Sequence, residues 1–359
     1  MVKYDVIILG AGIAGASSAY ALKQRGLKVL VLEKNTIASG DSHAAGAFLS
    51  PKMSKPSAYK SYLNTAFLYT TSFYKEHFSH LFKECGLLKL PLDEADKKRL
   101  KSYEPFMEVA WEKRGDDYFF PEAGLIEPQA LIHAMLEDIE VKEHHETKHI
   151  AYHDRCWQVD SFSATHLLFA TGSAPLAFDL PYLRQKKVAG YRYDVNYHDM
   201  QTLTYNIHRE LSFSHYHDNR VIIGATHIQG EIDLENAAMC DSQGLLEKAA
   251  SIHPLKELKI LKHYTGYRAS SFDYFPILGS IIHHDKTLQA YPSIKTGTKV
   301  PSQKYPMFPN LYIHTALASR GFVFAPYNAK LLADLILDAT PIDTKLSPHR
   351  LFIKWARKL

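Results

Sequence analysis

The 359-residue sequence predicts an α/β protein in which a parallel sheet is joined to a second, α+β part. A β-branched apolar run at residues 4–9 leads directly into a glycine-rich turn and a helix. A second apolar run, residues 166–169, also ends in a glycine turn. Between residues 187 and 263, alternating Tyr, Val, Ile and His side chains indicate antiparallel strands. We therefore predict a Rossmann-like nucleotide-binding domain beside an antiparallel-sheet domain.

The N-terminal glycines lie in the sequence context of a dinucleotide site. The pattern Gly-x-Gly-x-x-Gly follows the first strand, opens a helix that stops near Gly26, and precedes a second strand that ends at Glu33. Glycines let backbone N–H groups approach a pyrophosphate, and the helix N-terminus attracts its charge. A carboxylate at the end of the second strand accepts hydrogen bonds from a ribose diol and disfavours a 2′-phosphate. The residues predicted to contact the dinucleotide here are Gly10, Gly12, Ile13, Ala14, Gly15, Glu33 and Lys34.

The next segment favours FAD over NAD. Residues 37–51, "IASGDSHAAGAFLSP", form a small, polar loop where a nicotinamide domain would continue with alternating strands and helices. Such a loop suits backbone that packs along a flavin. The turn after residues 166–169 lies beside the same cofactor. Further predicted FAD contacts are Ser42, His43, Ala45, Gly46, Ala170, Thr171 and Gly172.

These motifs resemble those of the D-amino-acid-oxidase (DAO) superfamily of FAD enzymes. The chain resembles more closely the FAD-dependent oxidoreductase half of the bifunctional MnmC family, which modifies wobble uridine in tRNA. The resemblance implies an FAD-binding domain of the glutathione-reductase type. It is carried by "FFPEAGLIEP" (119–128), "VIIGATH" (221–227), "GYRASSFDYFPILG" (266–279), "ALASRGFVFAPYNAKLLADLI" (316–336) and the terminal Pro-x-Arg of "LSPHRLFIKWARKL" (346–359). This chain has Ala189-Gly190-Tyr191 where the family has Arg-Gly-Gln, and it lacks the methyltransferase half.

The resemblance implies a reaction on an N-substituted glycine. In 5-carboxymethylaminomethyluridine of tRNA, the carboxymethyl group would leave as glyoxylate and 5-aminomethyluridine would remain. FAD would take a hydride from the glycine α-carbon, and the protein would orient the substrate. The MnmC likeness implies non-covalent FAD, whereas "SHAAG" around His43 is similar to the covalent flavin site of sarcosine dehydrogenases, so a covalent link is the alternative.

Arg268 is the main catalytic candidate. In glycine-oxidase-like enzymes the matching arginine grips the substrate carboxylate as a bidentate fork. The alternative is a permanent structural contact, either a salt bridge to Asp273 or an interaction with a helix C-terminus. Arg320 and Tyr267 are the other candidates, Arg320 on the cofactor or the substrate side. Ser319, Arg320, Gly321 and Phe322 precede a helix whose N-terminus can stabilise negative charge on the flavin.

The composition of the chain limits which partners and which cellular compartment we expect for the protein. No apolar run is long enough to span a membrane. Three widely spaced cysteines fit a reducing cytoplasm, where we expect the protein to act. Residues 145–149, "HETKH", match a zinc-protease pattern, but their polar, strand-like surroundings argue against a metal, and we predict none. Basic residues in the C-terminal segment and in a lysine-rich loop, residues 293–305, could contact tRNA phosphates.

The flavin motifs recur along the chain, so the FAD-binding domain must be discontinuous. We predict that it comprises residues 1–50, 126–186 and 264–359, and that the substrate domain comprises residues 51–125 and 187–263. A tRNA-modifying oxidoreductase is the leading hypothesis. An oxidase or dehydrogenase of a free small amino acid, of the glycine or sarcosine type, and a non-catalytic flavin-containing tRNA-binding or assembly protein are the alternatives.

Overall fold

The computed structural model describes residues 3–174 and 178–359, so Pro175, at the end of the predicted second glycine turn, lies outside the described residues. The N-terminal strand, β1 (Lys3–Leu9), lies inside a parallel sheet whose order is β9–β2–β1–β12–β20. β19 extends this sheet antiparallel to β20, and β10 and β11 continue from β12 as a meander. The other strands are β2 (Val29–Leu32), β9 (Glu140–Lys142), β10 (Ile150–His153), β11 (Cys156–Val159), β12 (Phe162–Phe169), β19 (Ile277–Ile282) and β20 (Met307–Thr315).

Both faces of this sheet are buried, as is usual for parallel strands. Val6 and Ile8 of β1 pack into one core cluster, and Ile7 and Leu9 pack into another on the opposite face. The first cluster is covered by α1 (Ile13–Gln24), α2 (Ala58–His77), α4 (Pro128–Leu136) and α8 (Gly321–Asp338). The second is covered in part by α9 (His349–Ala356).

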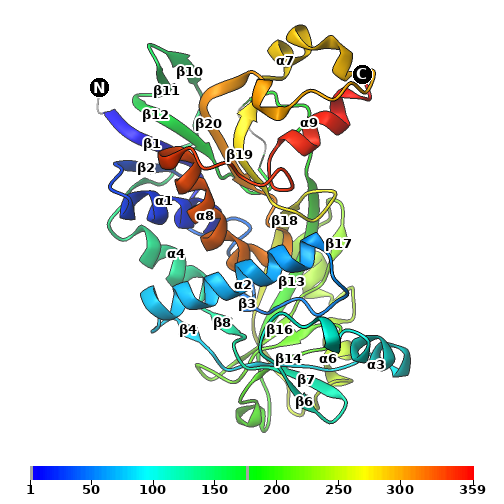
Figure 1. Cartoon of the computed structure of the whole chain (residues 1–359). Coiled ribbons are helices and arrows are strands. Elements are labelled where there is room, and N and C mark those ends of the chain that lie inside the picture. Colours follow the sequence, from blue (N-terminus) through cyan, green and yellow to red (C-terminus); the bar gives the residue numbers. More distant parts are fainter. Residues whose placement is uncertain (1–2, 175–177) are drawn as a thin grey trace.

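A second sheet lies below the first in Figure 1, and its strand order is β6–β7–β5–β14–β15–β16–β13, with β17 and β18 both pairing with β13. All of these pairs are antiparallel except β5 with β14. The strands are β5 (Leu87–Lys89), β6 (Glu112–Arg114), β7 (Asp117–Phe120), β13 (Lys186–Asn196), β14 (Asn206–His208), β15 (Ser212–Phe213), β16 (Val221–Gly224), β17 (Ile228–Gln229) and β18 (Lys259–Ser270). A third core cluster packs this sheet against α5 (Leu234–Met239) and α6 (Leu245–Ala250).

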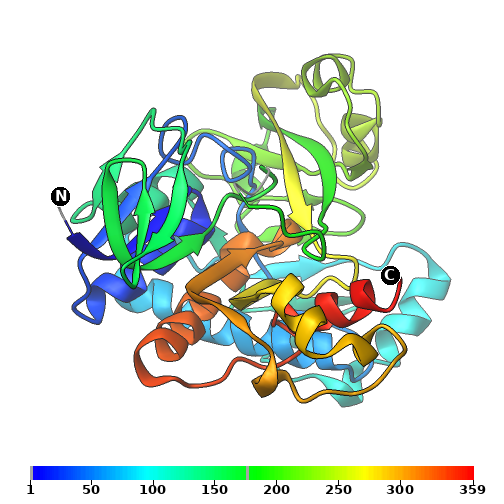
Figure 2. The ribbon, with the colours of Figure 1, turned by 90° about the horizontal axis from the view of Figure 1, so that it is seen from above.

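The longest pairing in the second sheet links the two parts of the molecule. β18, the yellow strand in Figure 2, pairs along its length with β13, and its last residue, Ser270, bridges to Leu317 just after β20. The C-terminal end of β18 therefore lies beside the parallel sheet, and Arg268 lies near that end. Smaller elements complete the fold: the sheet of β3 (Phe48–Leu49), β8 (Gly124–Ile126) and β4 (Phe82–Lys83), with α3 (Glu94–Lys101) and α7 (His284–Ala290).

The structure confirms the mixed α/β class and corrects two local interpretations. The periodicity of residues 62–85 predicts one long helix, but α2 ends at His77 and Phe82–Lys83 form a strand instead, because β8 offers them ladder partners. Residues 145–149 form an irregular connection between β9 and β10, neither helix nor strand. The predicted domain boundaries stay a prediction, although the strands of the second sheet come from residues 87–120 and 186–270.

Candidate active site

The first glycine turn is sterically closed to side chains. Gly10 has a φ of 105°, and a Cβ atom there would lie 2.5 Å from the carbonyl oxygen of Ala170. A Cβ atom on Gly15 would lie 1.9 Å from the carbonyl oxygen of Gly10. Strand, turn and helix thus pack with backbone against backbone. The first N–H groups of α1 have no partner within the helix, so this turn is suited to an anionic dinucleotide.

Glu33 faces the same turn from the end of β2. Its Oε2 accepts a hydrogen bond from the backbone N–H of Ala11 at 2.8 Å, and its Oε1 accepts one from the N–H of Asn35 at 2.9 Å. The hydroxyl oxygen of Ser42 accepts a hydrogen bond from the N–H of Ile13 at 3.0 Å, which brings the loop after β2 over the start of α1. The structure therefore brings the two ends of the predicted dinucleotide motif together.

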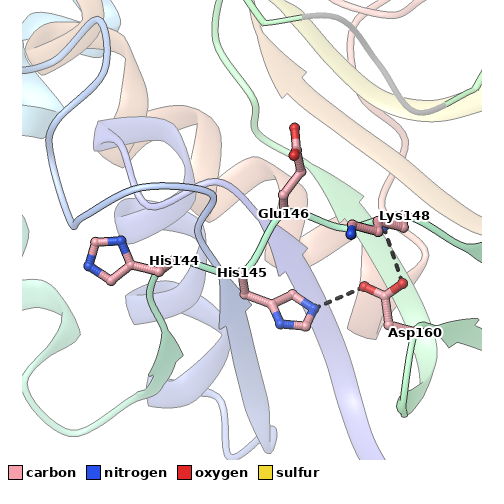
Figure 3. Close-up of a pocket in the computed structure, with 5 residues that line it drawn as sticks. All are labelled: His144, His145, Glu146, Lys148 and Asp160. Atoms are coloured by element: carbon pink, nitrogen blue, oxygen red, sulfur yellow. Dashed lines mark hydrogen bonds and ion pairs between the residues drawn. The ribbon is translucent and has the colours of Figure 1, made fainter.

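A polar hollow of about 390 Å³ lies beside the connection between β9 and β10 (Figure 3). It is lined by His144, His145, Glu146, Lys148 and Asp160. The backbone N–H of His145 donates to the carbonyl oxygen of Glu33 at 2.8 Å, so the hollow lies at the end of β2, where the adenosine part of a dinucleotide would fit. Lys34 lies at its edge and pairs with Glu146 at 2.5 Å.

The residues of "HETKH" lack the helix that the zinc-protease pattern requires, and the Nε2 atom of His145 lies 2.9 Å from Asp160 Oδ2. In the described part of the chain, Glu127, His217 and Asp218 form a group with ligand atoms close enough for a metal ion. Arg220 donates to both oxygens of Glu127 at 3.0 Å, so this carboxylate already has a cationic partner.

The loop predicted to run along a flavin is fastened to the second glycine turn. Asp41 accepts hydrogen bonds from the N–H and the hydroxyl of Ser173 at 2.9 and 2.8 Å, and burial raises the pKa of Asp41. The ring of His43 contacts Gln129 and lies 5.1 Å from the ring of Tyr264, centroid to centroid. The carbonyl oxygen of Gly172 accepts a hydrogen bond from Thr315. Ala45 and Gly46 lead from this loop into β3, and Thr171 lies in the turn itself.

The N-terminus of α8 lies beside the N-terminus of α1. A Cβ atom on Gly321, the first residue of α8, would lie 3.3 Å from the Cγ2 atom of Ile13, so α1 and α8 begin side by side. The carbonyl oxygen of Phe322 accepts a hydrogen bond from Tyr74, and Ser319 is exposed. Two converging helix N-termini and a backbone-only turn fit FAD, whose pyrophosphate and reduced ring both carry negative charge.

Arg268 lies on β18 with its guanidinium against backbone. Its Nη1 atom donates to the carbonyl oxygen of Thr226 at 3.0 Å, and a Cβ atom on Gly190, in the neighbouring strand, would lie 2.5 Å from Nη1. Burial lowers the pKa of Arg268 to about 10, although the carboxylate of Asp41 opposes this shift. Among the described residues no carboxylate lies within 4.0 Å of its nitrogens.

Asp273 does not pair with Arg268. Its carboxylate accepts hydrogen bonds from the Nε and Nη2 atoms of Arg350, at 2.9 and 3.1 Å. The terminal Pro-x-Arg motif thus supplies the partner of Asp273. Tyr267 is the neighbour of Arg268 in β18, so its side chain points to the other face of the strand. Its hydroxyl donates to the carbonyl oxygen of Ile232 at 3.0 Å. The structure therefore does not bring Tyr267 and Arg268 together.

Several further cations surround this region. Arg320 donates to the carbonyl and hydroxyl oxygens of Ser50 at 2.9 and 2.6 Å, and burial lowers its pKa. Lys52 and Lys89 are also half-buried, and the pKa of each is lowered by burial and by neighbouring cations that include Arg320. Burial, with Arg268 and Arg320 nearby, lowers the pKa of His227 to about 4. The site is therefore electropositive, and His227 is neutral at pH 7.

Sequence reasoning missed Asp41, Lys52, Lys89, Thr226 and His227. Asp41 lies in the predicted flavin loop, and Thr226 and His227 lie in the segment 221–227, but no local pattern marks these particular side chains. Lys52 and Lys89 come from a loop and a short strand. Only the preceding "GAFLSP" could have drawn attention to Lys52, because it continues the predicted flavin loop.

A parallel sheet with two glycine turns lies beside a mostly antiparallel sheet that carries the half-buried Arg268, and this arrangement is typical of dinucleotide-dependent oxidoreductases. The family model described as FAD dependent oxidoreductase (DAO) matches residues 5–335, and the chain belongs to this family. Through the residues that the structure describes, no helix is long and apolar enough to cross a membrane.

Curated relatives agree with this family. The bifunctional tRNA 5-methylaminomethyl-2-thiouridine biosynthesis protein MnmC of Legionella pneumophila (strain Corby) is 27% identical over 358 residues, which cover 92% of this chain and 54% of that protein. MnmC of Campylobacter fetus subsp. fetus is 23% identical, covering 98% of this chain and 60% of that protein. The chain thus spans little more than half the length of these relatives.

Solved structures share the fold. Glycine oxidase from Geobacillus kaustophilus matches with a TM-score of 0.74 at 20% identity and covers 96% of each chain. Iminodiacetate oxidase from Chelativorans sp. BNC1 matches with a TM-score of 0.74 at 18% identity and covers 96% of this chain and 98% of that chain.

Proposed function

We propose that this FAD-dependent oxidoreductase acts on the CH–NH group of 5-carboxymethylaminomethyluridine in tRNA, releasing glyoxylate and leaving 5-aminomethyluridine. One observation carries the proposal: Arg268 is a half-buried, desolvated guanidinium beside the predicted flavin loop, and no described carboxylate lies within 4.0 Å of its nitrogens. A buried cation of this kind calls for an anionic ligand. The carboxylate of an N-substituted glycine would supply it.

Bound FAD would supply the oxidant for the carbon–hydrogen bond next to that carboxylate. The Nη1 atom of Arg268 already donates one hydrogen bond to Thr226, and we assign its remaining N–H groups to the substrate carboxylate. Two parallel N–H···O bonds would fix the plane of the carboxylate, and with it the direction of the α-hydrogen. Loss of the amine proton and of the α-hydrogen with its electron pair gives an imine. Water then hydrolyses the imine to glyoxylate and the aminomethyl base.

The protein residues we assign to FAD are those of the two glycine turns, of the flavin loop and of the start of α8, with Arg320 at its edge. Non-covalent FAD is favoured, because the imidazole of His43 already contacts Gln129 and Tyr264. The cations near Arg320 favour a substrate with more than one negative charge, as in a polynucleotide.

A free small secondary amino acid is the second candidate substrate, because Arg268 alone would hold its carboxylate equally well. The cations Lys52 and Lys89 favour the larger, more anionic substrate. Anaerobic mixing separates the two. Flavin bleaching by tRNA that carries carboxymethylaminomethyluridine, without bleaching by glycine or sarcosine, supports the proposal. The reverse pattern supports the second candidate.

The Arg268→Lys variant tests whether the guanidinium binds the substrate carboxylate through two parallel hydrogen bonds. We expect it to retain FAD but to lose about 100-fold or more in kcat/KM with the modified tRNA, since a point charge cannot reproduce two parallel hydrogen bonds. Arg184→Lys is the matched control, because Arg184 is exposed and forms no side-chain hydrogen bond or ion pair with the residues that the structure describes. Unchanged turnover of Arg268→Lys, measured as glyoxylate release, would refute the role of Arg268.

A further inference from the structure

Two aromatic rings project from the loop between β18 and β19. Phe272 is 58% exposed and Tyr274 is 65% exposed, which makes them the most exposed aromatic side chains among the residues that the structure describes. They lie two residues apart, a few residues after Arg268. More than half of each side chain is therefore accessible to a ligand.

The loop holds these rings in a fixed place. Asp273, between them, points inward to Arg350, and Arg350 also donates to the carbonyl oxygen of Phe275 at 2.7 Å. The hydroxyl of Ser271 donates to the same carbonyl oxygen at 2.7 Å. Tyr274 has a φ of 66°, a left-handed conformation that is unfavourable for a large side chain. The ion pair and these hydrogen bonds thus hold a loop with an unfavourable backbone conformation, on which both rings are exposed.

Cations and the candidate active site border the two rings. The Nζ atom of Lys186 lies 4.7 Å from the centre of the Phe272 ring, and the Nζ atom of Lys354 lies 3.6 Å from Asp273. The side chain of Lys354 is 66% exposed. On the other side, the ring of Tyr274 lies 6.5 Å from the ring of Tyr59, whose neighbours include Arg320. The rings thus lie between exposed lysines and the site.

We propose that Phe272 and Tyr274 form a stacking platform for unpaired bases of an RNA strand whose reactive nucleotide enters the site at Arg268. The platform deepens the proposed function and rests on it. Bases stack on aromatic rings whatever their sequence, and flanking lysines attract the phosphates. A protein partner or a second copy of this chain would need a broader apolar patch, whereas these rings stand beside lysines.

Binding of RNA to the flavin-loaded full chain tests the platform. The probe is a fluorescein-labelled RNA stem-loop with a seven-nucleotide unpaired loop, followed by fluorescence anisotropy, and a fully paired duplex of equal length serves as the reference. We expect the double variant Phe272→Ala/Tyr274→Ala to weaken stem-loop binding by about tenfold or more. Binding of the duplex should change by less than about twofold. The single variant Phe272→Trp, in which Tyr274 is native, should bind the stem-loop with native affinity, because the platform needs a ring at this position.

The matched control is Phe106→Ala, which removes a ring that is 40% exposed elsewhere on the surface. It should leave stem-loop binding unchanged, and the flavin content and melting temperature of all variants report on folding. Equal stem-loop affinity of the double variant and the native protein overturns the proposal. A change in sedimentation with unchanged RNA binding also overturns it, in favour of self-association. RNA binding is measured without substrate oxidation. The binding experiment can therefore contradict the platform while oxidation of the modified tRNA supports the proposed function, and the opposite combination of results is also distinguishable.

Discussion

At the scale of single residues, the environment of Arg268 determines what it can bind. The sequence predicts that this arginine is partly desolvated and has a partner, and the structure removes Asp273 from the list of partners by pairing it with Arg350. Sequence reasoning could not foresee the other contacts. Gly190 and Thr226 approach the guanidinium across β13 and from the segment after β16, far away along the chain. Such contacts depend on strand register, which a single sequence does not specify.

The lowered pKa of Arg268 predicts how carboxylate binding depends on pH. Burial brings the pKa of the free site to about 10, so Arg268 is charged and binds a carboxylate below that pH and loses its charge above it. We expect the Kd for acetate, read from flavin absorbance, to be constant between pH 6 and 9 and then to rise about tenfold per pH unit above 10. Acetate has no group that titrates in this range.

His227 should not disturb that profile, because its pKa of about 4 leaves it neutral throughout the range tested. The Arg268→Gln variant provides the control and should bind acetate weakly at every pH. A Kd for the native protein that stays constant through pH 11, with an unchanged circular dichroism spectrum, would contradict the assignment of Arg268 to the carboxylate.

At the scale of elements, the sequence predicts those parts whose cause is local. The first strand, the glycine turn and α1 follow from a β-branched run, a backbone that excludes side chains, and a periodic apolar face. α2 ends earlier than its periodicity predicts, because residues 82 and 83 pair with β8, which is more than 40 residues away along the chain. A tertiary partner therefore overrides local helix propensity.

The glycine turn gives an element-scale prediction. The Gly15→Ala variant would place its methyl group 1.9 Å from the carbonyl oxygen of Gly10, so the helix must move away from the turn. We expect the purified variant to lose most of its FAD, measured by absorbance after gel filtration. The Gly115→Ala variant, in the turn between β6 and β7, meets no atom within 4 Å and should retain FAD. Equal FAD content in both variants would refute this account of the turn.

The ion pair of Arg350 with Asp273 gives a second prediction at the scale of elements. It joins α9 to the loop after β18, and both side chains are largely shielded, at 11% and 25% exposure. Charged hydrogen bonds of this kind contribute about 1.5–3 kcal/mol each, so we expect Arg350→Gln to lower the free energy of unfolding by about 2 kcal/mol. A double-mutant cycle with Asp273→Asn in urea isolates the pair, and additive effects of the two changes would show that they do not interact.

At the scale of the whole molecule, the site exists only where distant segments meet. Arg320 comes from the turn immediately before α8, Lys52 from the segment after β3, and Lys89 from β5 in the second sheet. Half-buried like charges that have no carboxylate within 4.0 Å among the described residues repel one another when no ligand is bound. No local pattern in the sequence brings these three together, because their proximity results from the contact between the two sheets. With no ligand bound, this repulsion opposes the charged forms of the three side chains, although the carboxylate of Asp96 favours the charged form of Lys89, and an anionic substrate would offset the repulsion further.

This balance predicts opposite effects on stability and on substrate binding. Lys89→Met removes a cation whose pKa burial lowers, so we expect the free energy of unfolding to rise by about 1 kcal/mol and the KM for modified tRNA to rise about tenfold. Lys98→Met, at an exposed position of α3, should change neither. The Tm and the KM are measured on the same preparations. A variant that is less stable and binds tRNA as before would show that Lys89 supports the fold and does not contact the substrate.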